Sequence, residues 1–363
     1  MARLGSIPPI NKGNAERSVT IKEVAAAADV SLGTVSNVLN RPNVVADETR
    51  IKVLQAIDRL GFVRNAGASL LRGGRARTIG LVALDVRNPF FTELARAVED
   101  VARDANYLVI LCNSDEDRTQ ERRYLELLEE HRVNGVLISP VNEKDKSLQW
   151  LRDRGTAVVL LGRERRNFCS VRLDDVAGGE LAASHLIELG HRRLAFVTAP
   201  LEIAAYNSRL TGIRQALARH DLPSDSCKVI EVGSLGNAPE GRTASEQLRS
   251  RHPEVTGVVC GNDLLALGLI AGLIHQGVDV PRDVSVVGYD DIELAQQSAL
   301  PLTTVRQPKN ELGRTATGLL LDEANRRANH AHQQIVFQPD LAIRETTRPP
   351  RSAAAARRRS SPR

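Results

Sequence analysis

The stretch 20–40 gathers short polar side chains of the types that bind nucleic acid. Hydroxyl groups suit phosphate oxygens, an asparagine can pair with an adenine through two hydrogen bonds, and a leucine can contact a thymine methyl group. In this stretch Asn37 and Leu32 are the candidates for base contact, and Gly33 lies beside them. The predicted DNA-binding residues are Thr20, Ser31, Leu32, Gly33, Thr34, Ser36, Asn37 and Asn40. Each of them alone could equally be a helix cap or an ordinary surface position.

Three short helices are predicted to position these side chains. Thr20 is a typical N-cap, and Glu23 three residues later completes a capping box. Ser31 caps a second helix over 32–39, after a three-residue turn, and valines 24, 30, 35 and 38 are expected to hold the pair together. A third helix opens at Asp47, carries apolar residues 51, 54, 57 and 60 on one stripe, and stops at Gly61. This is the pattern of a helix-turn-helix, whose second helix enters the major groove.

The rest of the chain alternates short apolar strands with amphipathic helices. Strands are predicted at 79–84, 108–111, 135–138, 157–161, 194–198, 228–232, 255–260 and 284–288. Helices are predicted between them, for example at 93–104, 118–131 and 146–154. Such alternation favours an α/β body with parallel sheets covered on both faces, and its length suits two doubly wound lobes.

Charge and cysteine usage limit the possible classes of protein. Residues 1–77 hold 12 Lys/Arg against 6 Asp/Glu, so the basic excess at the front favours a polyanionic partner. The four cysteines form no CxxC pair and are interpreted as reduced core residues, with no metal site and no cofactor expected. No signal peptide and no apolar run of the ~20 residues that span a bilayer are found, so a cytoplasmic location is expected. Phosphate-loop, dinucleotide, nucleophile-elbow and zinc-protease motifs are also missing, so no enzyme activity is expected.

The order of these motifs resembles the lactose-repressor (LacI/GalR) family of bacterial transcription regulators. The resemblance runs through the helix-turn-helix, then Asn88-Pro-Phe-Phe91, Gly261-Asn-Asp263, Gly288-Tyr-Asp-Asp291 and Thr304-Val-Arg-Gln-Pro308, and covers about residues 19–347. It implies a repressor that binds a pseudo-palindromic operator as a homodimer, with the helix after Asn88 at the dimer face. It also implies a hinge helix over 65–72 whose Leu71 wedges into the minor groove. Arg64, Gly67 and Ser69 depart from the family pattern, so this hinge is expected to fold less readily without operator.

A body of this family resembles a periplasmic binding protein that closes on a small molecule, often a sugar. Ligands of such sheets bind beyond the carboxyl ends of the strands. From strand ends and from the resemblance, the predicted effector-binding residues are Phe90, Phe91, Arg163, Arg209, Asn262, Asp290 and Gln307. Core packing for the phenylalanines, helix capping for Asn262, a turn for Asp290 and a surface place for Arg209 are the alternatives. Two departures from the family weaken the sugar assignment: Gly162 stands where some relatives carry an acidic residue, and no aromatic residue lies around Gly236. The few aromatic residues and the remote Trp150 argue against a strongly stacked ring ligand.

Domain boundaries follow from these patterns. We expect a flexible leader at 1–18, a head at 19–63, a hinge and linker at 64–77 and a body at 78–346, followed by a disordered basic tail at 347–363. The first lobe is predicted to comprise 78–176 and 306–331, and the second 177–305 and 332–346. The resemblance implies that tetramers of this family use a C-terminal leucine heptad, and residues 348–363 contain no leucine, so a dimer is favoured over a tetramer. A transport-type binding protein would share the body but not the head.

Overall fold

A computed structural model describes residues 19–62, 76–142, 144–233, 236–326 and 329–351. The chain divides into two compact units, residues 1–74 and 75–363, and each is described by itself. The predicted leader and hinge, with Leu71, lie outside the described residues.

The first unit is a small three-helix head. Its elements are α1 (Ile21–Ala27), α2 (Leu32–Asn40), the 3-10 turn η1 (Pro42–Val44) and α3 (Asp47–Leu60). Thr20 and Glu23 form the predicted capping box, Ser31 caps α2, and Gly61 ends α3 with a positive φ of 61°. The core contains Val24, Val35 and Val38 as expected, but α3 contributes Val53 and Ala56. Ile51 and Leu54 are exposed, so the predicted inner stripe of α3 was wrong at these two positions.

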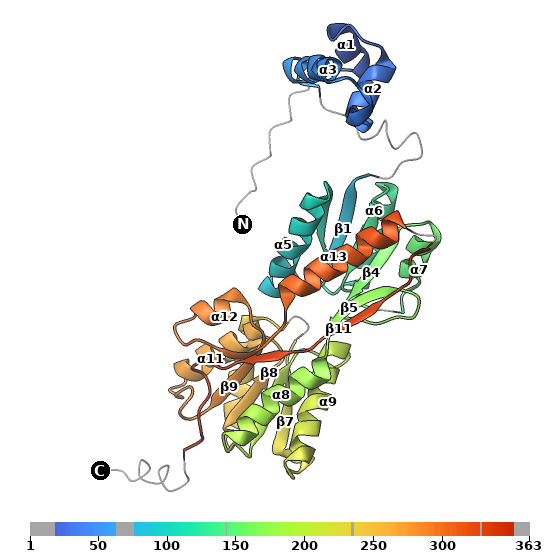
Figure 1. The fold of residues 1–363 in the computed structure, drawn as a ribbon. Coiled ribbons are helices and arrows are strands. Elements are labelled where there is room, and N and C mark those ends of the chain that lie inside the picture. Colours follow the sequence, from blue (N-terminus) through green and yellow to red (C-terminus); the bar gives the residue numbers. More distant parts are fainter. Residues whose placement is uncertain (1–18, 63–75, 143, 234–235, 327–328, 352–363) are drawn as a thin grey trace, which may run out of the picture. The chain divides into compact units, whose positions relative to one another are not determined.

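The first lobe of the body contains one six-stranded parallel sheet with the order β11-β5-β4-β3-β1-β2. Its strands are β1 (Thr78–Ala83), β2 (Leu108–Asn113), β3 (Gly135–Ile138), β4 (Ala157–Leu161), β5 (Cys169–Leu173) and β11 (Gln334–Phe337). Helices α5 (Pro89–Asp104) and α13 (Lys309–Asn325) pack together on one face (Figure 1). Helices α6 (Arg118–Glu130) and α7 (Lys146–Asp153) cover the other.

The second lobe repeats this arrangement. Its sheet has the order β12-β10-β9-β8-β6-β7, with β12 the one antiparallel strand among those described. The strands are β6 (Leu194–Thr198), β7 (Cys227–Glu231), β8 (Gly257–Cys260), β9 (Ser285–Asp290), β10 (Thr303–Arg306) and β12 (Asp340–Ala342). Helices α8 (Asp175–Glu188) and α9 (Ala204–Arg219) pack on one face. The other face carries α10 (Ala238–Arg251), α11 (Asp263–His275) and α12 (Glu293–Gln297), and η2 (Ser224–Ser226) precedes β7.

Three crossovers join the lobes, and one of them corrects a predicted boundary. The chain crosses after β5, after β10 and between β11 and β12. The boundary predicted at 332 was wrong, because β11 pairs with β5 and belongs to the first lobe. The predicted tail also begins too early. Thr346 is buried and donates to Val286, and Thr347 bonds to His185, so the described body continues to residue 351.

Candidate functional site: a recognition helix and an interlobe cleft

Helix α2 turns one face into the head core and leaves the predicted base-reading residues outside. Val35 and Val38 are buried, whereas Leu32 is 45% exposed and Gly33 and Asn37 are exposed. The helical repeat of 3.6 residues produces this separation. Asn37 therefore lies on the open face, and contact with a base remains a prediction for it.

The predicted phosphate-binding hydroxyls have structural partners of their own. Thr20 bonds to the Glu23 carboxylate, and Ser31 accepts from the backbone N–H of Thr34 at 3.1 Å. The hydroxyls of Ser31 and Thr34 lie 2.9 Å apart. Thr34 and Ser36 are half-buried. The Thr20 cap positions the start of α1 and the Ser31 cap the start of α2, and contact with DNA remains a prediction for this set. The side chain of Asn40 lies outside the described part.

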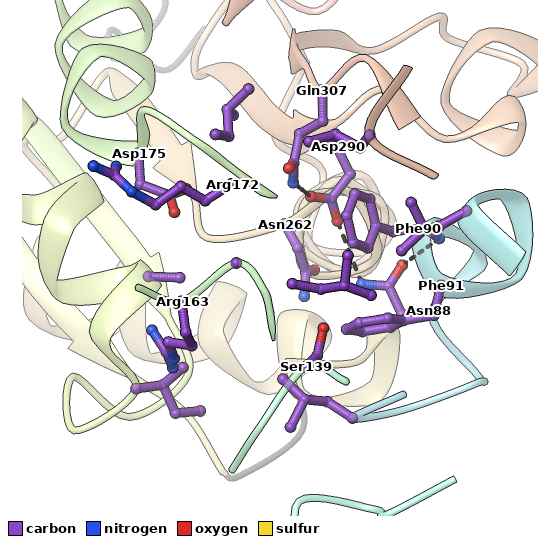
Figure 2. A pocket seen from close by; sticks show the side chains of 18 of the residues that line it. Asn88, Phe90, Phe91, Ser139, Arg163, Arg172, Asp175, Asn262, Asp290 and Gln307 are labelled. Carbon is purple, nitrogen blue, oxygen red and sulfur yellow. Dashed lines mark hydrogen bonds between the residues drawn. The ribbon is translucent and has the colours of Figure 1, made fainter. Parts of the chain in front are cut away.

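A cleft between the two lobes brings all seven predicted effector residues together. It encloses about 990 Å³ of empty space, its opening to solvent included. The cleft lies at the carboxyl ends of the strands, as expected for parallel sheets. The residues that line it from the predicted set are Arg209 and, labelled in Figure 2, Phe90, Phe91, Arg163, Asn262, Asp290 and Gln307.

Asp290 is the last residue of β9, and its carboxylate is hydrogen-bonded to both lobes. It accepts from Gln307 Nε2 at 2.7 Å and from Asn88 Nδ2, across the lobes, at 3.3 Å (Figure 2). Its φ is 119°, a conformation that side-chain-bearing residues rarely adopt. Burial raises the pKa of Asp290, although the positive charge of Arg209 favours the ionised carboxylate. Such a strained, buried carboxylate is typical of a functional position rather than a simple turn.

Arg209 is buried in a polar and aromatic cage on α9. Its Nε donates to Asp175 Oδ1 at 2.8 Å, and its Nη1 donates to the Gly261 carbonyl. The guanidinium lies 3.6 Å from the ring centre of Tyr289, whose hydroxyl donates to the same Asp175 oxygen at 2.9 Å. Burial alone would lower the pKa of Arg209, but Asp175 holds it above its usual range. The surface alternative for Arg209 is therefore wrong.

Two glycines of α8 make room for this cage. A Cβ at Gly178 would lie 2.2 Å from the Tyr289 hydroxyl oxygen, and one at Gly179 would lie 2.0 Å from the Arg209 carbonyl oxygen. Any larger residue would push α8 away from α9 and β9. The close approach of these elements thus positions the Arg209–Asp175 pair.

Asn262 caps α11 and also lines the cleft, so its capping role is confirmed and effector binding stays a prediction. Its Oδ1 accepts from the Leu265 N–H at 2.8 Å and caps α11, while its Nδ2 points to the Tyr206 hydroxyl at 3.5 Å. Burial raises the pKa of Tyr206 to about 12, so the phenol stays protonated and can donate to a ligand. Tyr206 lines the cleft and supplies an aromatic surface that the residues around Gly236 do not.

Both phenylalanines of α5 line the cleft, as predicted. Their rings meet edge to face with centroids 5.1 Å apart. Phe90 also packs against the core of the second lobe, so it has core and cleft contacts at once. Asn88 caps α5 by accepting from the Phe90 N–H, which fixes the start of this helix.

Sequence reasoning missed several polar residues of the cleft. They are Asp85, Glu116, Ser139, Arg172, Asp175 and Tyr206. Asp85 and Ser139 follow β1 and β3, so the strand-end rule could have found them. Burial, reinforced by the Asp85 and Asp115 carboxylates, raises the pKa of Glu116 to about 7. Arg163 and Arg172 stand on another part of the wall, and Arg172 bonds to Glu164.

Two family models match this chain. Residues 20–65 match "Bacterial regulatory proteins, lacI family", and residues 183–347 match "Periplasmic binding protein-like domain". The chain is 36% identical over 338 residues to the transcriptional repressor PurR of Vibrio parahaemolyticus, covering 91% of this chain and 98% of that protein. It is 33% identical over 339 residues to the transcriptional regulator DegA of Bacillus subtilis, with the same coverage.

Solved structures of similar fold cover almost the whole chain. A lac repressor dimer bound to operator and the anti-inducer ONPF superposes with a TM-score of 0.80 at 25% identity, covering 92% of this chain and all of that one. A complex of the regulator CelR with cellobiose gives a TM-score of 0.67 at 30% identity, covering 91% of this chain and all of that one. None of the described helices is long and apolar enough to cross a membrane.

Proposed function

The chain belongs to the lacI family of bacterial regulatory proteins, and on that premise we propose which residues perform each step of its function. It is a sequence-specific DNA-binding transcriptional regulator that binds operator as a dimer and responds to a small-molecule effector. In this proposal the exposed face of α2 reads the operator, and the interlobe cleft binds the effector. The outcome at the regulated promoter is repression.

One observation carries the effector assignment: polar side chains from both lobes converge on a single cleft. Asn88 and Asp290 bond to each other across it, and Arg209 is held in place by Asp175. Within the described part of the chain, only Nε and Nη1 of Arg209 have hydrogen-bond partners, so Nη2 is available to a ligand. A rigid donor whose own geometry is fixed by neighbours favours specific recognition.

The chemistry of the walls favours a polyhydroxylated ligand. Asp290, Asn262 and Arg209 offer paired acceptors and donors that match vicinal hydroxyl groups. The rings of Phe91 and Tyr206 supply apolar surface for the carbon face of a sugar. Gly162 leaves open space, since nothing lies within 4 Å of where its Cβ would be. Cellobiose in the similar CelR complex supports this class of ligand.

Ligand binding would act by shifting the population of lobe arrangements. The lobes bond directly at Asn88–Asp290 and at the Glu293 N–H, which donates to Glu93 at 3.0 Å. The ammonium group of Lys309 forms an ion pair with the same Glu93 carboxylate at 3.1 Å. An effector that replaces the Asn88–Asp290 bond changes the relative stability of open and closed forms. A coupling of about 1.4 kcal/mol is enough for a tenfold change in operator affinity.

This cleft is assigned to binding rather than catalysis, since the relatives are transcription regulators. We place the protein in the cytoplasm, where its DNA target lies.

The test begins with selection of a preferred palindrome from random DNA by the full-length protein. Operator affinity is then measured by fluorescence anisotropy at fixed salt, with and without single mono- and disaccharides. We expect one sugar to change the operator Kd by tenfold or more. A chain that prefers no palindrome over random DNA at physiological salt would refute the DNA-binding role.

A pair of variants on α9 tests the cleft itself. Arg209→Lys keeps the charge beside Asp175 but loses the planar fork, so effector binding should weaken about tenfold or more while effector-free operator affinity stays unchanged. Arg219→Lys is the matched control, because Arg219 is 69% exposed, pairs with Glu180 and is not among the cleft-lining residues described. An Arg209→Lys protein that melts normally and responds normally would remove Arg209 from the site.

A further inference from the structure

Four potential metal ligands converge at the edge of the first lobe, away from the cleft. They are the Cys169 thiol, the Glu323 carboxylate and the imidazoles of His330 and His332, whose ligand atoms all lie within 4.8 Å of one another. Cys169 begins β5, Glu323 lies in the last turn of α13, and the histidines precede β11. Parallel strands β5 and β11 both begin at this edge, which is opposite to the carboxyl ends that form the cleft. We propose that these four residues bind a Zn²⁺ ion.

The spacing of the ligand atoms fits a tetrahedral ion. Cys169 Sγ lies 3.1 Å from His330 Nε2 and 3.8 Å from His332 Nδ1. Bonds of ~2.0–2.3 Å to a tetrahedral zinc place neighbouring sulfur and nitrogen ligands roughly 3.4–3.6 Å apart. The two distances lie on either side of this value, so shifts of a few tenths of an ångström would complete the geometry.

A neighbouring carboxylate orients one of the imidazoles as a metal ligand. Asp322 Oδ2 lies 2.8 Å from His330 Nδ1, so this nitrogen carries the proton. The Nε2 lone pair of His330 then points toward Cys169. A carboxylate behind a metal-binding histidine fixes its tautomer and raises its basicity. Burial raises the pKa of the Cys169 thiol in the metal-free chain, and the backbone N–H of Gln333, which donates to Sγ at 3.3 Å, opposes this rise.

The charge of the set matches a divalent cation. A thiolate and a carboxylate carry two negative charges, and the two neutral imidazoles add none, so Zn²⁺ makes the group neutral. Neutrality matters here because Cys169 and Glu323 are buried, and a buried net charge is costly. Mixed sulfur and nitrogen ligands favour zinc over calcium or magnesium, which prefer oxygen.

An entry path exists on the solvent side. Glu323, His330 and His332 line a second cavity, which opens to the surface beside Arg152. Arg152 Nη2 lies 3.2 Å from His332 Nε2. Metal binding through Nδ1 puts a proton on Nε2, so Arg152 must turn away from the ring. It can do so while it stays bonded to the carbonyl of Asn167.

The ion would tie together three segments that are distant in sequence. These are the start of β5, the end of α13 and the crossover segment before β11. Zn²⁺ at about 100 times its Kd should raise the melting temperature of the body by roughly 5 °C, because it binds only the folded chain.

The experiment uses the full-length, untagged protein stripped of metal by a chelator. Zn²⁺ is returned by equilibrium dialysis and counted by plasma mass spectrometry, and Co²⁺ serves as the spectroscopic probe. We expect one zinc per chain and a thiolate-to-cobalt charge-transfer band with the intense visible bands of a tetrahedral ion. Cys169→Ser should lose the charge-transfer band, and His332→Gln should bind zinc at least tenfold more weakly.

Cys227→Ser is the matched control, because Cys227 is a half-buried thiol on β7 of the other lobe. It should keep the stoichiometry and the spectrum. If Cys169→Ser does not fold, the zinc affinity of His332→Gln tests the proposal instead. His332 is exposed, so its substitution leaves the core intact. A wild-type protein without the thiolate band, a band that survives in Cys169→Ser, or undiminished zinc affinity in His332→Gln would each overturn the proposal.

Discussion

Asn37 stands on the exposed face of α2, one turn after Gly33, while its neighbour Val38 is buried. An asparagine so placed can read one adenine through two hydrogen bonds. We therefore expect Asn37→Ala to reduce discrimination at one operator position by about 1–3 kcal/mol, with little change elsewhere. The measurement is binding of the variant to operators that carry each base at each position.

Gln55→Ala on α3 is the control, since Gln55 is also exposed but lies on another helix of the head. It should leave the base preferences unchanged. If Asn37→Ala weakened binding to every sequence equally, Asn37 would be a backbone contact rather than a base reader.

The residues of the cleft show what the sequence could and could not provide. Arg209, Asn262 and Asp290 were predicted from the resemblance and from strand ends, and all three line the cleft. Asp175 was missed because its role depends on a contact with Arg209, 34 residues away. That contact exists because α8 and α9 approach closely at Gly178 and Gly179, and no local pattern reports such packing.

At the scale of elements, the cap of α11 can be separated from ligand binding. Serine is as good an N-cap as asparagine, so Asn262→Ser should keep stability within about 0.5 kcal/mol. It removes the Nδ2 donor near Tyr206, so effector affinity should fall about tenfold. Thermal melts and effector titration measure the two effects.

Asn237→Ser is the matched control for this cap. Asn237 caps α10 in the same way and is not among the cleft-lining residues described. Its substitution should change neither property. A loss of stability with normal effector affinity in Asn262→Ser would mean that Asn262 is only a cap.

Helix α6 is joined to the loop after β3 through a buried carboxylate. Glu121 is 2% exposed and accepts from the Val141 N–H at 2.8 Å. Burial raises its pKa from 4.5 to about 7, although the Val141 bond opposes this rise. Because the folded state holds the proton more tightly than the unfolded chain, stability should fall as pH rises from about 4.5 through 7.

Glu121→Gln removes this ionisation and keeps the acceptor. Above pH 7 the variant should be about 1–3 kcal/mol more stable than the wild type, and near pH 5 the two should be nearly equal. Urea unfolding at pH 5 and pH 8 measures the difference. Glu126→Gln, on the exposed face of α6, should show no such dependence. Equal effects at both pH values would mean that Glu121 does not titrate in this range.

The sequence predicted the apolar strands well, because continuous valine, leucine and isoleucine runs mark buried parallel strands. It missed β5, β10, β11 and β12, whose mixed sequences owe their pairing to neighbours. It also put β11 in the wrong lobe, because only its register with β5, from Gln334–Ser170 to Phe337–Leu173, assigns it to the first sheet. Pairing partners distant in sequence leave no local signal.

On the scale of the whole molecule, charge and recognition lie in different segments. Residues 19–62 hold 5 Lys/Arg and 5 Asp/Glu, so the basic excess of residues 1–77 lies in 1–18 and 63–77. We therefore expect the folded head to supply shape and base contacts, and the basic flanking sequences to supply phosphate attraction that salt can screen. In the proposed function an effector bound in the body changes operator affinity through lobe arrangement.

Coupling between the cleft and the head predicts how effector and operator change each other's affinity. If the effector changes the operator Kd by tenfold, operator must change the effector Kd by the same factor, about 1.4 kcal/mol, because the two effects share one thermodynamic cycle. Effector binding measured by calorimetry with and without saturating operator tests the equality. Glu93→Gln weakens the link to Lys309 and should alter both factors equally, while Glu99→Gln, farther along α5, should alter neither. If saturating operator left the effector Kd unchanged, effector binding and operator binding would not be coupled, and the proposed link between the cleft and the head would be refuted.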